Sequence, residues 1–327
     1  MIKIVIMALN KKEYLQEVLG THKMSKVDDL MDKYRKRRKE IKEKLETHYK
    51  DKIYSPLNSG SYAKHTAINT KFDLDVVVPF KKKSFSTLEE MFDDVFDFLN
   101  ETYGTEATVR KQKVSIGIIF YSDNDGDEIS IDIVPGRELN EDQYNEDNKL
   151  NLYVHSKYGL LAEKTHLLTN IKAQIEHIKS RDNERKIIRL LKIWKSSNNE
   201  DYKSFLMELI TIKAFDKDSI SGDLWEMLES TMEYIRDNIT KDGFTLSDPG
   251  NSGNNVADTL ESWQKENLSS KMENMLDRIE DNSDNLKIYF PVNPDFKEED
   301  NTKSNEGYGV KTGATTFSVP TQNQRFG

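Results

Sequence analysis

The sequence contains no cysteine in its 327 residues. This absence excludes disulfide bonds, thiol catalysis and cysteine-ligated zinc modules, and it is consistent with a reducing cytoplasm. Long apolar runs are also missing. The only N-terminal one, at residues 4–9, is far shorter than the roughly 20 residues that span a bilayer, and it lacks a small-residue cleavage site. We therefore expect a cytoplasmic protein with no membrane partner, whose metal sites use carboxylates or histidines.

Positive charge is in deficit, with 48 Lys and Arg residues against 57 Asp and Glu residues and a net charge of -9. This balance argues against a protein that mainly grips long nucleic acid, because such binding depends on many Lys or Arg contacts to phosphates. The basic run at residues 35–39 is more typical of the solvated face of a helix. Hydrophobic residues make up 36% and charged residues 32%, which indicates a globular chain with a very polar surface.

Hydrophobic periodicity predicts an α+β protein. A long helix is expected over residues 27–49, and a glycine-containing turn then leads into a buried strand at 72–80. Ser86 and Glu89 form a capping-box pattern before an amphipathic helix that Gly104 should end. Two strands are expected at 109–121 and 128–134. Beyond about Leu150 the pattern is helical, with segments at 170–178, 184–196, 202–215, 224–239 and 258–279.

These elements predict four parts of the chain. Residues 1–26 form an N-terminal extension, whose apolar run is either an extra strand or lies upstream of a functional start at Met24. Residues 27–160 form a catalytic lobe with the long helix at its beginning, and residues 161–290 form a mostly helical lobe across a central cleft. Residues 291–327 are polar with sparse aromatics, and we expect a flexible tail there.

Three carboxylates are candidates for metal binding and catalysis. Asp73 and Asp75 are two residues apart on a predicted strand, which places both on one face. Asp132 lies on a neighbouring predicted strand, opposite the isoleucines with which it alternates. Clustered carboxylates repel unless a proton or a cation lies among them, and Mg²⁺ prefers such oxygen ligands. Three of them can hold two ions, which is the arrangement of two-metal phosphoryl transfer.

Gly60 and Ser61 lie shortly before the acidic strand. Glycine lets the backbone approach a phosphate closely, and serine offers a hydroxyl donor, so the pair is a candidate triphosphate grip. Each feature also has an ordinary interpretation. An Asp-x-Asp pair is often merely exposed, a Gly-Ser pair is usually a turn, and Asp132 is compatible with a solvent-facing residue of an alternating strand. The order of all three along the chain favours catalysis.

The same residues resemble the signature of polymerase-β-type nucleotidyltransferases. The resemblance is carried by SGS at 59–61, DLDV at 73–76 and IDIVP at 131–135. The stretches SGSYAKHTAI at 59–68 and VPGR at 134–137 are similar to the branch that includes cyclic-GMP-AMP synthase and oligoadenylate synthetase. Bacterial members of that branch are the CD-NTases of CBASS anti-phage signalling. The resemblance implies a polymerase-β-like sheet lobe and an oligoadenylate-synthetase-like helical lobe.

The resemblance continues at RLLKIWK (189–195) and KSFLMEL (203–209). By that match Lys192 and Ser204 would contact the donor triphosphate, as would Gly60 and Ser61. The ordinary alternative for Lys192 is a surface lysine that snorkels from a helix with a buried apolar face. For Ser204 it is an N-terminal helix residue that satisfies a backbone donor.

The expected function is therefore an Mg²⁺-dependent synthase that joins ATP and other nucleoside triphosphates into a cyclic di- or trinucleotide. Asp73, Asp75 and Asp132 would hold two Mg²⁺ ions, for which Mn²⁺ can substitute. The product would act on a downstream effector, and a regulatory or conjugating protein would act on the tail ending in Gly327. Two alternatives stay open. One is a toxin-type nucleotidyltransferase that modifies RNA or protein, and the other is a catalytically silent nucleotide-binding module.

Overall fold

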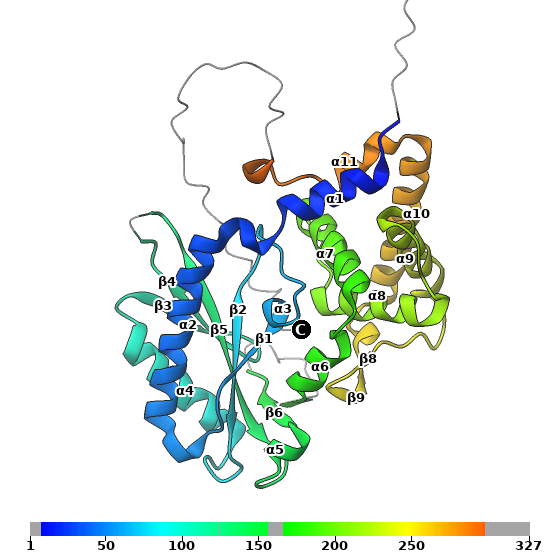
Figure 1. The fold of residues 1–327 in the computed structure, drawn as a ribbon. Coiled ribbons are helices and arrows are strands. Elements are labelled where there is room, and N and C mark those ends of the chain that lie inside the picture. Colours follow the sequence, from blue (N-terminus) through cyan, green and yellow to red (C-terminus); the bar gives the residue numbers. More distant parts are fainter. Residues whose placement is uncertain (1–7, 124, 156–165, 298–327) are drawn as a thin grey trace, which may run out of the picture.

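The computed structural model describes residues 8–123, 125–155 and 166–297. It shows one lobe built on a β-sheet and a second lobe built from helices (Figure 1). Within the described residues, no helix is both long enough and apolar enough to cross a membrane.

The described part of the sheet lobe contains a seven-stranded mixed sheet. The strand order is β1-β2-β5-β4-β3, and β6 joins β5 to β7. The central strands β2 and β5 run parallel to each other, and every other pair of neighbours is antiparallel. The strands are β1 (Leu57–Ser59), β2 (Leu74–Phe80), β3 (Ala107–Lys111), β4 (Ile116–Phe120), β5 (Ile129–Glu138), β6 (Leu150–Tyr153) and β7 (His166–Thr169).

Two long helices, α2 (Asp28–Tyr49) and α4 (Leu88–Tyr103), cover one face of this sheet (Figure 1). Their apolar residues recur at helical spacing and join the core formed by the apolar side chains of β2, β4 and β5. The helix predicted at 27–49 is confirmed within one residue, and the end at Gly104 is also confirmed. The predicted cap at Ser86 is wrong. Thr87 is the N-cap, because its hydroxyl accepts a hydrogen bond from the Glu90 amide at 3.0 Å.

Other differences from the prediction concern strands. The segment 109–121 is not one strand but two, β3 and β4, which pair with each other around a turn at 112–115. The chain returns to the sheet as β6 and β7 after Leu150, where only helices were expected. β1 and the short helix α3 (Gly60–Ala63) occupy the segment that the sequence predicts to be a turn.

The helical lobe contains α6 to α10 at the places that periodicity predicted, within a few residues. The N-terminal helix α1 packs against α7 and α9, and its Tyr14 hydroxyl donates to the Phe290 carbonyl at 2.9 Å. Residues 11–21 are therefore part of this lobe's core. Its elements are α1 (Lys11–Thr21), α6 (Ile171–Ile178), α7 (Asp182–Ser197), α8 (Ser204–Asp218), α9 (Leu224–Asn238), β8 (Ser247–Asp248), β9 (Asn251–Asn255), α10 (Ser262–Asp281) and α11 (Leu286–Tyr289).

Short elements complete the described chain, namely α5 (Tyr144–Asp147) and the 3₁₀ turns η1 (Met24–Val27), η2 (Lys50–Lys52), η4 (Val256–Thr259), η5 (Ser283–Asn285) and η6 (Pro294–Phe296). The first residues of the predicted tail are packed, since Asn293 is buried and donates to Asn69 Oδ1 at 3.1 Å. The rest of that tail, including Gly327, lies outside the described residues. So does most of the predicted strand at residues 4–9.

Candidate active site

Two of the predicted carboxylates lie side by side at the centre of the sheet. Asp75 on β2 is in register with Asp132 on the parallel neighbour β5. Both residues are buried, with exposed fractions of 6% and 0%. Neighbouring strands are about 4.8 Å apart, and residues in register point to the same face. Ile131 and Ile133 point into the core under α2 and α4, so Asp132 lies on the opposite face, as the alternation predicted.

The third predicted carboxylate, Asp73, comes immediately before β2 and is half-buried. Its position two residues before Asp75 is consistent with the same face of the sheet. The Asp73 charge also acts on the ammonium group of Lys192 in the helical lobe. Asp73 is therefore close enough to Lys192 of α7 for its charge to act on that ammonium group.

The glycine turn lies directly against Asp75 of this pair. Ser59, at the end of β1, is in register with Asp75, and Gly60 follows with a φ of +69°. A Cβ atom added to Gly60 would lie 1.6 Å from Asp75 Oδ2, so only glycine fits both the backbone conformation and the space. Ser61 is the next residue of α3 and is partly exposed. The glycine turn and the Asp75 carboxylate are thus in contact, whereas the sequence indicates only that one follows the other along the chain.

Lys192 is buried in the interface between α7 and the loop that follows α3. Its Nζ donates to both the carbonyl and the hydroxyl oxygen of Thr66, each at 3.0 Å. Burial lowers the pKa of Lys192 to about 8, partly opposed by the nearby charge of Glu208. The alternative interpretation of Lys192 as a snorkelling surface lysine is therefore wrong.

Sequence reasoning missed the ion pair beside Lys192. Lys64 Nζ lies 2.8 Å from Glu208 Oε1, and both residues are buried. The Lys64 ammonium also lies over the Phe205 ring, 4.8 Å from its centroid. This pair links the loop after α3 to α8. One local signal points to this pair: a glutamate inside the apolar stretch FLMELI indicates a buried charge that needs a partner.

Ser204 is the first residue of α8 and is partly exposed. It precedes Glu208 by four residues, so the two side chains share the face of α8 that meets Lys64. The N-cap position is held by Lys203, and among the described residues no side chain caps this helix. The alternative in which Ser204 satisfies a backbone donor of the helix is therefore not observed.

A separate group of carboxylates lies in the turn between β4 and β5. Oxygens of Asp123, Asp125 and Asp127 lie within 4.8 Å of one another, a geometry that could hold a metal ion. Lys33 of α2 places its Nζ 2.6 to 2.7 Å from all three. Hydrogen bonds from Lys33 lower the pKa of Asp123. An ammonium group of the chain itself thus lies at the centre of these three carboxylates.

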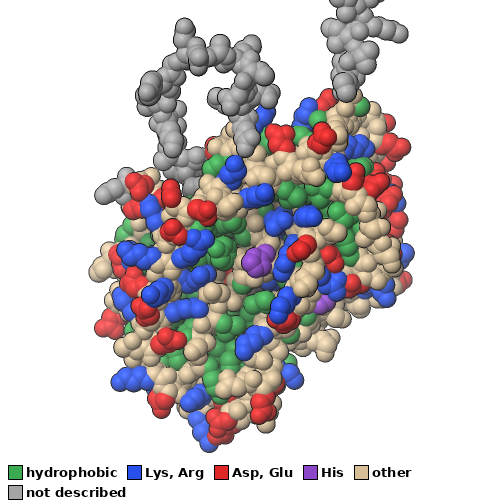
Figure 2. Space-filling model, viewed as in Figure 1, with side chains coloured by type: hydrophobic (Ala, Val, Ile, Leu, Met, Phe, Trp, Pro, Cys, Tyr) green, Lys and Arg blue, Asp and Glu red, His purple; other side chains and the backbone are tan. Residues whose placement is uncertain are grey.

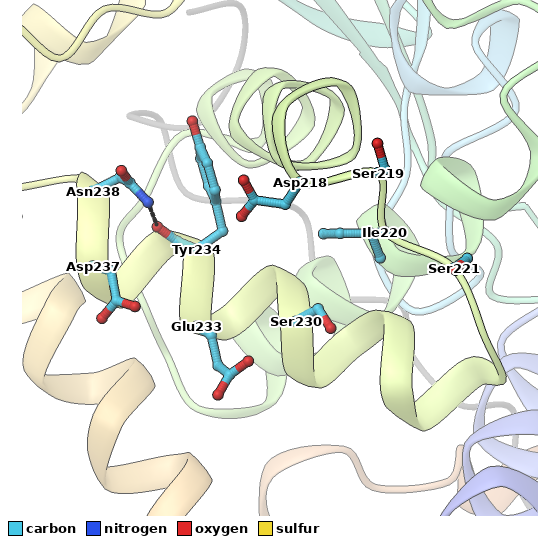
Figure 3. Close-up of a pocket in the computed structure, with 9 residues that line it drawn as sticks. All are labelled: Asp218, Ser219, Ile220, Ser221, Ser230, Glu233, Tyr234, Asp237 and Asn238. Carbon is cyan, nitrogen blue, oxygen red and sulfur yellow. Dashed lines mark hydrogen bonds between the residues drawn. The ribbon is translucent and has the colours of Figure 1, made fainter.

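The surface near the candidate site is basic. Lys and Arg side chains gather over α2 and around the centre of the view, where α3 and α7 approach each other (Figure 2). A cavity of a different kind lies on the helical lobe. It is formed by the end of α8 and by α9, and none of the predicted site residues lines it (Figure 3). Its lining is mainly acidic and polar, with Asp218, Glu233 and Asp237 among its residues, which does not suit a triphosphate.

Comparisons with known proteins identify relatives of this chain. Residues 10–153 match the family model of the second messenger oligonucleotide or dinucleotide synthetase domain. A curated relative, the CBASS oligonucleotide cyclase CdnC of Escherichia coli (strain KTE188), is 24% identical over 226 residues, which cover 65% of this chain and 66% of the relative. The match thus spans just under two thirds of that relative's length.

Solved structures show the same fold. CdnC of E. coli MS115-1 with ATP is 22% identical with a TM-score of 0.64, covering 85% of this chain and 93% of that one. CdnG of Bradyrhizobium diazoefficiens in complex with GTP is 15% identical with a TM-score of 0.66, covering 86% and 96%. The DncV cyclic AMP-GMP synthase of Vibrio cholerae is 12% identical with a TM-score of 0.58, covering 75% and 70%. The predicted α+β, polymerase-β-like fold is confirmed.

Proposed function

We propose that this chain, whose residues 10–153 match the family model of second messenger oligonucleotide or dinucleotide synthetases, joins nucleoside triphosphates into a cyclic di- or trinucleotide signal in CBASS anti-phage defence. The proposal rests above all on one observation. Asp75 and Asp132 are buried in register on adjacent parallel strands, and Gly60 lies directly against the Asp75 carboxylate.

The donor set of this site fits divalent cations. Buried carboxylates on neighbouring strands are tolerated best when a cation lies between them, and oxygen ligands are those that Mg²⁺ prefers. We assign Asp73, Asp75 and Asp132 as the ligands of two Mg²⁺ ions, which Mn²⁺ can replace. Such ions, when bound, lower the pKa of an attacking hydroxyl and stabilise the oxygen of the leaving pyrophosphate.

The remaining residues would hold the donor triphosphate. Gly60 lets the backbone of α3 approach the phosphates, and the Ser61 hydroxyl would donate a hydrogen bond to them. Lys192 would supply a positive charge from the helical lobe. Its Nζ binds Thr66, in the loop that follows Ser61 and α3, so its charge lies near the proposed phosphate site. Ser204 would donate from the start of α8. In this arrangement the sheet lobe, which includes β7, and the helical lobe, which includes α1, would hold the triphosphate from two sides.

The partners follow from this chemistry. We propose ATP and other nucleoside triphosphates as substrates, and an effector protein that binds the cyclic product. A regulatory protein is also part of the proposal, because the related CdnC of E. coli MS115-1 has been solved in a complex with HORMA-deltaN. The tail that ends in Gly327 is proposed as the segment on which a conjugating protein acts.

The direct test is to incubate the purified chain with all four triphosphates and Mg²⁺, and to identify the products by chromatography and mass spectrometry. A cyclic oligonucleotide that the Asp75→Asn variant does not make would support the proposal. Asp237→Asn is a matched control, because it removes a carboxylate that pairs with Arg236 on the surface of α9. Transfer of a nucleotide onto RNA or protein would instead favour the toxin-type alternative. Binding of Mg²⁺-ATP without consumption would favour the silent module.

A further inference from the structure

A hydrogen-bonded pair of side chains supports Asp132 from the turn between β3 and β4. Gln112 is buried there, and its Nε2 donates to Asp132 Oδ1 at 3.2 Å. The hydroxyl of Ser115, also fully buried, donates to Gln112 Oε1 at 2.8 Å. The Gln112 amide group is therefore held at both ends, by a donor on one side and by an acceptor on the other.

The orientation of this amide follows from chemistry. An ionised carboxylate only accepts hydrogen bonds, so the NH₂ end of Gln112 must face Asp132 and the oxygen must face the Ser115 hydroxyl. The opposite orientation would place two oxygen atoms against each other. A backbone hydrogen bond also holds this turn, because the main-chain N–H of Gln112 donates to the main-chain carbonyl of Ser115 at 2.8 Å.

Gly117 provides the space in which this contact forms. It lies on β4 in register with Asp132. A Cβ atom added to Gly117 would lie 2.4 Å from Gln112 Nε2 and 3.3 Å from Asp132 Oδ1. Any larger residue would therefore push the end of the Gln112 side chain away from Asp132. Gln112, Ser115 and Gly117, all in the β3–β4 hairpin, thus together determine one hydrogen bond to the Asp132 carboxylate.

We propose that Gln112, oriented by Ser115 and accommodated by Gly117, is a positioning residue that fixes the carboxylate of Asp132 for metal binding. The inference rests on the proposed function, because it takes Asp132 as a metal ligand. Partners that hold a ligand from behind set its orientation, and their loss typically weakens metal affinity by about 10- to 100-fold. Gln112 itself does not touch the substrate in this role.

The test measures Mn²⁺ binding to the full chain without nucleotide, by the electron paramagnetic resonance signal of free Mn²⁺. Gln112→Met removes the donor at similar volume, and Ser115→Ala removes the group that orients it. Gly117→Ala removes no polar group and only displaces the amide. We expect each variant to weaken Mn²⁺ binding by about 10-fold or more. We also expect the KM for Mg²⁺ in product formation to rise while kcat recovers at high Mg²⁺.

The matched control is Gln174→Met. Gln174 Nε2 donates to Asp248 Oδ1 at 2.9 Å in the helical lobe, so this variant loses the same kind of hydrogen bond away from the proposed metal site. Its Mn²⁺ affinity should equal that of the wild-type chain. Thermal unfolding of every variant shows whether the fold is retained. A variant that unfolds is set aside in favour of Gly117→Ala, which makes the smallest change.

Asp132→Asn separates failure of this inference from failure of the proposed function. If Asp132→Asn leaves Mn²⁺ affinity unchanged, the metal assignment itself is wrong. If Asp132→Asn weakens binding while folded Gln112→Met and Gly117→Ala both bind Mn²⁺ within about twofold of wild type, Gln112 has no positioning role. Weakening in those variants together with unchanged binding by Gln174→Met supports the inference.

Discussion

Replacing Gly60 by alanine should nearly abolish product formation while leaving the chain folded. Two separate penalties arise from the added Cβ. The first is backbone strain, because φ at Gly60 is +69° and an L-residue in the left-handed region costs roughly 1–2 kcal/mol. The second is a collision, because the Cβ would lie 1.6 Å from Asp75 Oδ2 and 2.6 Å from its Cγ.

The size of the collision sets the expected loss of activity. Non-bonded heavy atoms settle at about 3.5 Å, so the Asp75 carboxylate must move by roughly 2 Å or the α3 turn must shift by a similar amount. A misplacement of about 1 Å can cost a hundredfold in rate. We therefore expect Gly60→Ala to lower kcat/KM by at least about a hundredfold, which corresponds to about 2.7 kcal/mol of barrier.

Gly243→Ala is the matched control. Gly243 has a φ of +74°, and apart from its two chain neighbours no atom of the described residues would lie within 4 Å of an added Cβ there. This variant thus carries the backbone strain without the collision. The assay compares the free energy of unfolding in urea and the rate of product formation for both variants. We expect both variants to lose stability through the strain, Gly60→Ala to lose more through the collision, and only Gly60→Ala to lose activity. Equal activity in the two variants would refute the idea that Asp75 must occupy its observed place.

Three further predictions concern charged residues of the site. Asp75→Asn should lower the rate by at least about a hundredfold with little change in Tm, and near-normal turnover would rule out its role as a metal ligand. Burial lowers the pKa of Lys192 to about 8. The charges of Lys64 and Lys195 act in the same direction, and those of Glu208 and Asp73 oppose it. Its charge is lost as pH rises through that value, so kcat/KM for the triphosphate should fall above about pH 8. Lys192→Met should remove this limb of the profile. The pKa of Lys192 in the folded chain lies below the ordinary 10.5, so burying its charged form lowers the free energy of unfolding, and this loss is greatest below about pH 8. The loss disappears as pH rises toward 10.5. The free energy of unfolding measured in urea should therefore increase over this range. Glu208→Ala leaves the buried Lys64 without its 2.8 Å partner and should cost about 3–5 kcal/mol of unfolding free energy, most of which replacement of both residues by methionine should restore.

Helices were the part of the fold that the sequence predicted well. α2 and α4 were placed almost to the residue, because the spacing of apolar residues and the turn residues at their ends are local signals. The prediction failed where strands pair over long distances. β3 and β4 were read as one strand, since an apolar run does not show where it folds back. β6 and β7 were missed because they are four residues each and carry little pattern.

The sequence by itself determined which residue types the chemistry has available: carboxylates in place of thiols, a glycine turn before an acidic strand, and a lysine in an apolar helix. Only the tertiary structure decided how they meet. Strand register places Asp75 beside Asp132, and the packing of α7 and α8 against the loop after α3 buries Lys192 and pairs Lys64 with Glu208. Gln112 is the clearest example of a contact that the sequence does not predict, since nothing near it in the sequence indicates a hydrogen bond to Asp132. Hydrophobic periodicity indicates only which residues share one face of a helix or of a strand. Contacts between distant segments depend on how the whole core packs.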